Sequence, residues 1–203
     1  MNEIDTTKKY YDKNGLSWVN SKTNSFVHEI PFRKIVSLWP EKARIIDIGC
    51  AGGIHVPLFL GIGNKLKYYG VDISKLFIKI AQSRYPQLTF ALSNIADAAT
   101  LPKVKFDGFF ASAVLMHVPF TLWDSMFSNI EKITKGGGYG YITLPVQHPS
   151  AVKNENDVRH FTILSEQEQI GYFKNRGWKI KSKGIIDGTS TNAVWCYYIV
   201  QLP

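Results

Sequence analysis

The sequence contains little cysteine. Its 203 residues include only Cys50 and Cys196, and neither has neighbours of the metal-binding kind. Two cysteines cannot build the disulfide framework of a small secreted domain, and they match no zinc-ligand spacing. We therefore expect no metal site and a fold held by an apolar core, which a chain of this length can supply.

Long apolar runs are also missing. No stretch approaches the roughly 20 consecutive apolar residues that a membrane-spanning helix needs. The N-terminal stretch MNEIDTTKKYYDKNG is polar and has no apolar signal core. We therefore expect a cytoplasmic protein without a membrane partner.

The sequence has no long basic run, although its net charge is +8. A positive balance is typical of proteins with anionic partners such as RNA. Because the lysines are scattered, an ordinary basic surface explains the same balance, and an RNA partner stays open as an alternative.

Internal repeats and low-complexity segments are absent too. Hydrophobic residues make up 45% of the chain and charged residues 20%, which is typical of a globular protein. We therefore expect one domain over residues 1–203, with residues 1–40 forming a helical N-terminal cap. The chain is expected to act as a monomer or a homodimer.

What the sequence does contain is an alternation of strand and helix patterns. Apolar runs predict strands at 44–49, 67–73, 88–92, 106–115, 138–145, 178–187 and 193–201. Helical patterns lie at 6–13, 26–38, 55–63, 74–84, 121–133 (ended by KGGG) and 165–177. This alternation predicts an α/β protein with a parallel sheet covered on both faces. The last two strands have no helix between them, so they should form an antiparallel hairpin at one edge.

A glycine-rich turn follows the first of these strands. The segment ARIIDIGCAGGIHVPLFL places Asp47, Gly49, Gly52 and Gly53 between a strand and a helix. Ligands of open parallel sheets bind beyond the carboxyl ends of the strands, and glycine lets a ligand lie against bare backbone. Asp72 ends the second strand, 19 residues after Gly53, where its carboxylate can accept hydrogen bonds from a ribose diol. Together these features predict a nucleotide site.

The turn does not suit a dinucleotide. The run from Gly49 to Gly53 fails the G-x-G-x-x-G fingerprint. Asp47 would also repel a pyrophosphate, whereas it suits a ligand with an amino group. A nicotinamide-dependent oxidoreductase is therefore disfavoured.

At this point the residues resemble a family. IIDIGCAGG resembles the first motif, D-x-G-x-G-x-G, of class I S-adenosylmethionine-dependent methyltransferases, and GVDIS resembles their second. LSNIADAATLP, FDGFFASAVLMHV and ITKGGGYGYITLP resemble the exits of the third, fourth and fifth strands. The resemblance covers residues 30 to 201 and implies a Rossmann-like three-layer sandwich. Its mostly parallel seven-stranded sheet would hold S-adenosyl-L-methionine and release S-adenosyl-L-homocysteine.

The resemblance also implies roles for residues. Asp47 would hold the methionine amino group, and Asp72 the ribose hydroxyls. The remaining cofactor contacts would line the methionine and ribose (Gly49, Cys50, Ala51, Gly53) and the adenine (Ile73, Asn94, Ile95). The backbone carbonyls of Ala111 and Ser112 would face the methionine part.

Two positions depart from the family pattern. Ala51 replaces the usual second glycine, and its methyl group fits if the backbone φ there is negative. Asn94 replaces the usual aspartate, although its amide oxygen can still accept from the adenine amino group; Asp97 is a substitute. Both departures keep open a non-catalytic scaffold that retains the fold.

Histidines and aromatic residues are the candidates on the acceptor side. His117 follows the fourth strand, and His148 and His160 flank the polar segment after the fifth. Imidazole titrates near neutral pH, so His117 and His148 are candidate catalytic bases and His160 a candidate substrate contact. Tyr10, Tyr11 and Trp18 are expected to form a lid over the cofactor or to pack as a crossing helix.

The residues after the fourth strand narrow the acceptor class. Ala111 to Val114 lack the Asn/Asp-Pro-Pro-Tyr/Phe run of enzymes that methylate adenine or glutamine amides, and no cysteine is placed for cytosine chemistry. The resemblance is to the general small-molecule group, so we predict O- or N-methylation of a small-molecule acceptor by in-line displacement. An RNA methyltransferase is the alternative.

Overall fold

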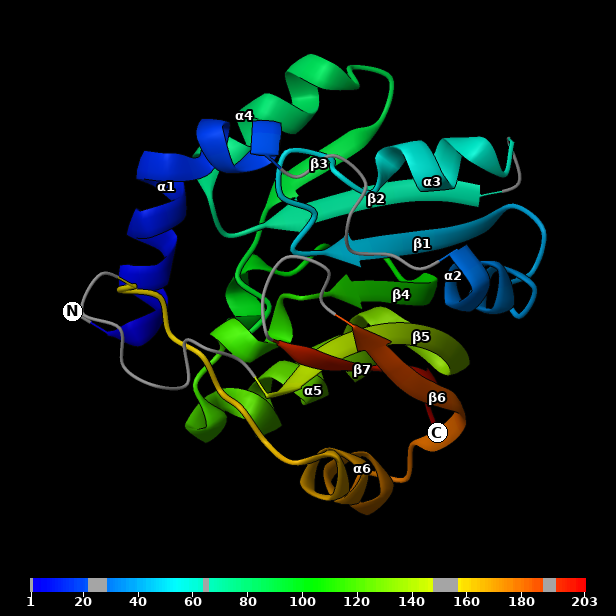
Figure 1. Cartoon of the computed structure of the whole chain (residues 1–203). Coiled ribbons are helices and arrows are strands. Elements are labelled where there is room, and N and C mark those ends of the chain that lie inside the picture. Colours follow the sequence, from blue (N-terminus) through cyan, green and yellow to red (C-terminus); the bar gives the residue numbers. More distant parts are fainter. Residues whose placement is uncertain (1, 22–28, 64–65, 148–156, 188–192) are drawn as a thin grey trace.

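The computed structural model describes residues 2–21, 29–63, 66–147, 157–187 and 193–203. These residues form one sheet of seven strands between two layers of helices (Figure 1). The strands are β1 (Ala43–Ile48), β2 (Leu66–Asp72), β3 (Thr89–Leu92), β4 (Phe106–Ser112), β5 (Thr134–Gln147), β6 (Lys179–Asp187) and β7 (Val194–Gln201).

The strand order is β3-β2-β1-β4-β5-β7-β6. Neighbouring strands from β3 to β5 run parallel, and β7 is antiparallel to both β5 and β6. The expected edge hairpin and the Rossmann-like sandwich with one reversed strand are therefore confirmed.

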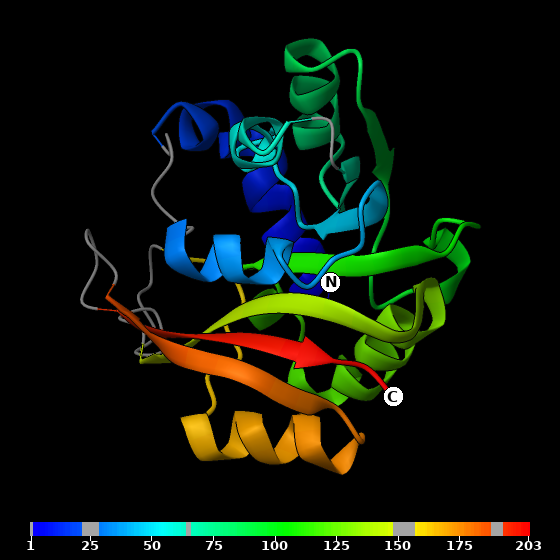
Figure 2. The same cartoon turned by 90° about the vertical axis from the view of Figure 1, so that its right-hand side faces the viewer.

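The helices are α1 (Glu3–Ser21), α2 (Glu29–Val36), α3 (Val56–Gly61), α4 (Lys75–Arg84), α5 (Trp123–Ile133) and α6 (Glu166–Asn175). One apolar core lies between the sheet and α5 and α6, where Phe127 and Phe173 are fully buried. A second core lies on the other face, with Ile35 of α2 and Phe59 of α3. Figure 2 shows α6 lying beside β6 and β7. No described helix is long and apolar enough to cross a membrane.

Local signals explain several helix ends. The Ser74 hydroxyl accepts from the Phe77 N–H at 3.2 Å, as its N-cap position predicts. Ser165 and Glu168 form the predicted capping box of α6. The KGGG segment does not stop α5, however, because the helix ends at Ile133 and β5 begins at Thr134. The glycines at 136–138 lie inside the strand instead.

The N-terminal helix is longer than expected. α1 runs from Glu3 to Ser21, whereas the sequence pattern indicated only 6–13; α2 begins at Glu29, and residues 22–28 lie outside the described chain. Figure 1 shows α1 beside the ends of β1 and β2 that carry the arrowheads, next to α4. The two helices meet closely at Gly15, where a Cβ atom would lie 2.9 Å from the Phe77 ring. α1 therefore covers the carboxyl ends of the parallel strands.

Candidate active site

A cavity lies at the carboxyl ends of β1 and β2, beneath α1. Its volume is about 70 Å³, small beside the roughly 300–1,000 Å³ of pockets that hold small-molecule ligands. Two of its wall residues, Ile4 and Thr7, belong to α1, which therefore forms part of its roof. The other wall residues are Ile48, Gly49, Val71, Asp72, Ile73, Ser93, Asn94, Ile95, Val114, His117 and Val118.

The glycine turn adopts a conformation that needs glycine at two positions. Gly49 has a φ of 72° and Gly53 a φ of 77°, both in the left-handed region. A Cβ atom at Gly49 would lie 2.3 Å from Val114 Cγ2, and one at Gly53 would lie 2.9 Å from the Tyr85 ring. The backbone N–H of Gly49 donates to the Val71 carbonyl at 2.8 Å, which fixes the turn to β2.

Ala51 has a φ of 48°, so the negative φ under which its methyl group would fit without strain is not found. A left-handed conformation costs a residue with a Cβ atom about 1–2 kcal/mol. The Ala51 methyl group is buried in a cluster with Tyr11, Val19 and Phe77, and its N–H donates to Asp72 Oδ2 at 3.0 Å. Packing against α1 and this hydrogen bond hold the strained conformation.

Asp72 joins the turn to the cavity. Its Oδ1 accepts from the Ser74 N–H at 2.8 Å and its Oδ2 accepts from the Ala51 N–H. Burial raises the pKa of Asp72 to about 6, although the two backbone donors act in the opposite direction. Each carboxylate oxygen has a second lone pair, so the group can still accept from a ligand in the cavity.

Asp47 is fully buried and does not line the cavity. Its Oδ2 accepts from the Tyr68 hydroxyl at 2.6 Å and lies 3.5 Å from His55 Nδ1. Its Oδ1 has no hydrogen-bond partner among the described residues. An unsatisfied carboxylate oxygen beside the turn suits an amino group or a bridging water, and the role assigned to Asp47 stays a prediction.

The predicted adenine contacts gather on one wall. Ile73, Asn94 and Ile95 all line the cavity. Asn94 Oδ1 accepts from the Ala96 N–H at 3.0 Å, which orients the side chain within its own loop and leaves a second lone pair. The substitute Asp97 is exposed, outside the cavity lining, and caps a short 3-10 helix.

Besides Asp47, five predicted cofactor contacts lie outside the cavity lining: Cys50, Ala51, Gly53, Ala111 and Ser112. The Cys50 thiol is buried below the turn, where burial raises its pKa well above the ordinary value. Ser112 Oγ lies 3.4 Å from Thr143 Oγ1, and Ala111 packs in the core beneath. Their predicted contacts stay predictions, and for Ala111 and Ser112 these concern backbone carbonyls.

His117 lines the cavity with both ring nitrogens engaged. Its Nδ1 lies 2.7 Å from the His160 carbonyl, which can only accept, so Nδ1 carries the proton. Nε2 of the neutral ring then accepts from the Tyr11 hydroxyl at 3.1 Å. Burial lowers the pKa of His117 to about 4, which keeps the ring neutral at physiological pH.

Arg159 extends this network, although no sequence motif singles it out. Its Nη1 donates to the Tyr11 hydroxyl at 3.2 Å, and its Nε and Nη2 donate to the two oxygens of Asp157. The guanidinium also lies 5.0 Å from the Tyr10 ring centroid. The segment after β5 therefore binds the face of α1 that carries both tyrosines.

His160 also binds the segment after β5 to α1. Its N–H donates to Thr7 Oγ1 at 2.8 Å, and its ring lies 3.1 Å from Glu3 and 2.9 Å from Thr162. His160 lies beside α1 and does not line the cavity, and its predicted substrate contact stays a prediction. His148, the other predicted base, lies outside the described residues.

The three aromatic candidates, Tyr10, Tyr11 and Trp18, all lie in α1, and their role as a lid stays a prediction. Tyr11 contacts His117, whereas the Trp18 ring packs 5.6 Å from the Phe77 ring of α4. Neither lines the cavity, where Ile4 and Thr7 take that place. The i, i+3, i+7 spacing of Ile4, Thr7 and Tyr11 indicates that they share one face of a helix. The predicted helix began at residue 6 and so did not include Ile4.

These features together define a fold. A sheet of this order with one reversed strand, a glycine turn after β1 and an acid at the end of β2 form the class I methyltransferase fold. The model of the family described as "Methyltransferase domain" matches residues 46–142. The chain therefore has the class I methyltransferase fold, and the methyltransferase-domain model matches a little less than half of its length.

Two curated relatives are trans-aconitate 2-methyltransferases. The protein of Variovorax paradoxus is 36% identical over 80 residues, which is 39% of this chain and 30% of the relative. The protein of Afipia carboxidovorans is 29% identical over 117 residues, which is 57% of this chain and 44% of the relative. The matched stretches span less than half of either relative.

Solved structures share the fold across the whole chain. Magnesium protoporphyrin IX methyltransferase from Synechocystis PCC 6803 with bound S-adenosylhomocysteine has a TM-score of 0.74, with 15% identity and 100% coverage of both chains. N-methyltransferase NodS from Bradyrhizobium japonicum WM9, also bound to S-adenosylhomocysteine, has a TM-score of 0.72 with 13% identity and 100% coverage of both. At such identities the likeness shows the fold.

The residues around the cavity fit S-adenosylmethionine. Gly49 brings backbone to the cavity wall, and the close approach of Val114 leaves no room for a side chain at this position. Asp72 offers free lone pairs to a ribose diol, and the unsatisfied Oδ1 of Asp47 suits an ammonium group, directly or through water. Ile73 and Ile95 supply apolar surface for a flat ring.

Proposed function

We propose that the protein transfers a methyl group from S-adenosylmethionine to a carboxylate oxygen of a small organic acid. When bound, the cofactor supplies an electrophilic methyl group on a sulfonium centre, and the protein's task is alignment. Asp72 and the glycine turn hold the ribose and the methionine end. The loop after β4, which carries Val114 and His117, faces the same cavity and is the side for the acceptor.

The choice of a carboxylate rests on the state of His117. The ring donates to a carbonyl, accepts from Tyr11 and has a pKa of about 4, so it is a poor proton acceptor at neutral pH. A hydroxyl or an ammonium acceptor must lose a proton when it is methylated. A carboxylate, with an ordinary pKa of about 4, is already ionised. His117 then acts as a positioning residue; its proposed catalytic role and that of His148 are not needed for this acceptor.

The relatives support an acid as the acceptor. Both are named for trans-aconitate, which is a tricarboxylate. None of the thirteen residues of the cavity wall is Lys or Arg, so no basic stripe of the kind that would favour RNA lines this cavity.

The test uses S-adenosylmethionine with a labelled methyl group and a panel of di- and tricarboxylates that includes trans-aconitate. Label that appears in an acid and is released as methanol by alkali supports a methyl ester. Alkali-stable label on an amine, or label transferred to RNA, would refute the carboxylate assignment. A calorimetric titration with S-adenosylmethionine is run in parallel, because failure to bind it would favour the non-catalytic scaffold.

A further inference from the structure

A second concavity lies at the opposite end of the sheet, where the parallel strands begin. Its volume is about 340 Å³. Five cationic side chains line it: Lys42, Arg44, Lys67, Lys105 and Lys135. Lys67 and Asp72 stand at the two ends of β2, about 17 Å apart at the usual rise per strand residue. The concavity is therefore separate from the candidate active site.

The strand order brings these cations together. Lys42 and Arg44 flank the start of β1, Lys67 is the second residue of β2, Lys105 precedes β4 and Lys135 is the second residue of β5. The parallel register pairs Arg44 directly with Lys67. The five residues come from four chain segments, so the sequence shows no basic run there.

Little negative charge compensates them. Asp107, the one acid in this wall, forms an ion pair with Lys135 and accepts from the Arg44 backbone N–H at 2.7 Å. Among the described residues, Lys42, Arg44, Lys67 and Lys105 form no ion pair, although the Arg44 charge also acts on the Asp107 carboxylate. Two of them are oriented by backbone carbonyls, since Lys105 donates to Lys132 and the Arg44 guanidinium donates to Lys105.

Gathering like charges costs stability, because neighbouring cations repel. The backbone adds a further cost at Lys42, whose φ of 59° lies in the left-handed region that glycine adopts more easily. An anion bound among these groups would offset the repulsion.

We propose that this concavity binds a compact polyphosphate anion. Lysine ammonium groups and an arginine guanidinium are the natural partners of phosphate oxygens. The volume is at the low end of the roughly 300–1,000 Å³ of small-molecule pockets. Single-stranded nucleic acid is bound with stacking aromatic rings, and none of the wall residues is aromatic. A compact anion therefore fits better than a strand of RNA.

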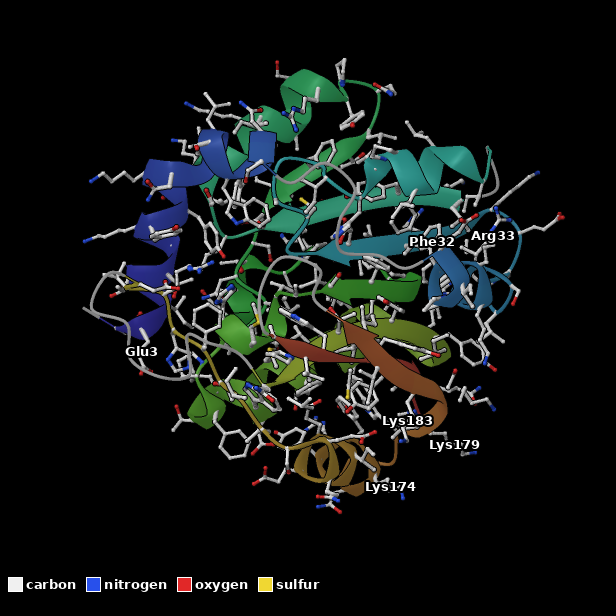
Figure 3. All side chains as sticks on the ribbon, in the orientation of Figure 1. Glu3, Phe32, Arg33, Lys174, Lys179 and Lys183 are labelled. Carbon is white, nitrogen blue, oxygen red and sulfur yellow. The ribbon has the colours of Figure 1, made fainter. Side chains whose placement is uncertain are left out.

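The probe for the test is sodium tripolyphosphate, titrated calorimetrically into the protein at physiological ionic strength. The wild type should bind it with a submillimolar Kd, and Lys67→Gln combined with Lys105→Gln should weaken binding at least tenfold. The matched control is Lys174→Gln combined with Lys179→Gln, which removes the same charge from exposed positions of α6 and β6 (Figure 3). This pair should change the affinity less than twofold.

A third variant separates binding from folding. Lys42→Gly should weaken tripolyphosphate binding severalfold while leaving thermal stability equal or higher, because it relieves the left-handed strain. The proposal would be overturned if the two double Lys→Gln variants lost equal affinity for tripolyphosphate, or if the wild type did not bind it. Tighter binding of a uridine 20-mer through the same lysines would also overturn it in favour of nucleic acid.

Discussion

Ala51 holds a backbone conformation that glycine adopts more easily. Ala51→Gly should release about 1 kcal/mol of strain and lose about 0.8 kcal/mol of methyl burial. We therefore expect its free energy of unfolding to stay within about 1 kcal/mol of the wild type. Ala51→Val should lower the free energy of unfolding by more than about 2 kcal/mol, because a β-branched residue rarely adopts a left-handed backbone conformation. Denaturant unfolding measures both, and a well-tolerated valine would contradict the assigned strain.

Asp72 should control cofactor affinity. Asp72→Ala removes a charged hydrogen-bond acceptor and should raise the Kd for S-adenosylmethionine about 30- to 150-fold, or roughly 2–3 kcal/mol. Asp97→Ala is the matched control, since Asp97 caps a nearby turn but lies outside the cavity wall. Calorimetry should show less than a twofold change for this control. Similar losses in both variants would contradict the ribose assignment.

Residue positions at the site were predictable only where the motif fixes them. Gly49, Asp72, Asn94 and His117 line the cavity because they follow the ends of strands, and strand ends can be read from the sequence. Asp47 is a strand residue whose carboxylate meets Tyr68 and His55. Side chains alternate between faces of a strand, so a shift of one residue at its end changes what a side chain faces. The motif alone does not fix that.

At the level of elements, the contact between α1 and α4 depends on Gly15. Gly→Ala within a helix ordinarily stabilises by about 1 kcal/mol. At Gly15 the new methyl group would meet the Phe77 ring, so Gly15→Ala should loosen α1 and speed amide hydrogen exchange in it. Gly171→Ala is the control, because Gly171 of α6 has open space around it and should show the ordinary gain. Equal stabilisation by both would mean that α1 does not pack tightly there.

The length of α1 could not be predicted for a physical reason. Its buried positions, Thr7, Tyr11, Gly15 and Val19, recur every fourth residue, but two of them are not large apolar residues. The buried face is therefore regular, but the sequence shows only a weak pattern of apolar residues along it. The segment at 157–162 was equally hidden, because it has no regular structure and its contacts lie far away in the sequence.

For the molecule as a whole, two buried groups give opposite pH dependences of stability. Asp72 has a folded pKa of about 6 against an ordinary value of 3.8, so its contribution is lost as pH rises through 6. His117 has a folded pKa of about 4 against an ordinary value of 6.5, so its contribution is lost as pH falls through 4. Because the two shifts are similar in size, they largely cancel between pH 4 and 6.5.

Single substitutions should reveal the pH dependence of stability that each of the two groups contributes. Relative to the wild type, Asp72→Asn should gain on the order of 3 kcal/mol in free energy of unfolding between pH 4 and pH 6.5. His117→Gln should lose a similar amount over the same range. Urea unfolding at several pH values measures both differences. Parallel pH profiles for the wild type and either variant would contradict the corresponding pKa shift.

The overall architecture was largely predictable, whereas its charge distribution was not. Each strand and helix carries local signals, such as the Ser165 capping box and the turn-linked final strands, and their alternation implies a parallel sheet. The cluster of Arg44, Lys67 and Lys105 arises only when β1, β2 and β4 lie side by side. Proximity of that kind follows from strand order, which no local pattern contains.

The roof of the candidate active site also has a consequence for biosynthesis. α1 leaves the ribosome before the strands of the sheet, yet Arg159 and His160 bind it across 148 and 153 residues of sequence. Contacts of such separation form late, because a long loop must close first. A nascent chain that has released β1 to β4 therefore has a glycine turn without its finished roof. The cavity is completed only after the segment that follows β5 has been synthesised.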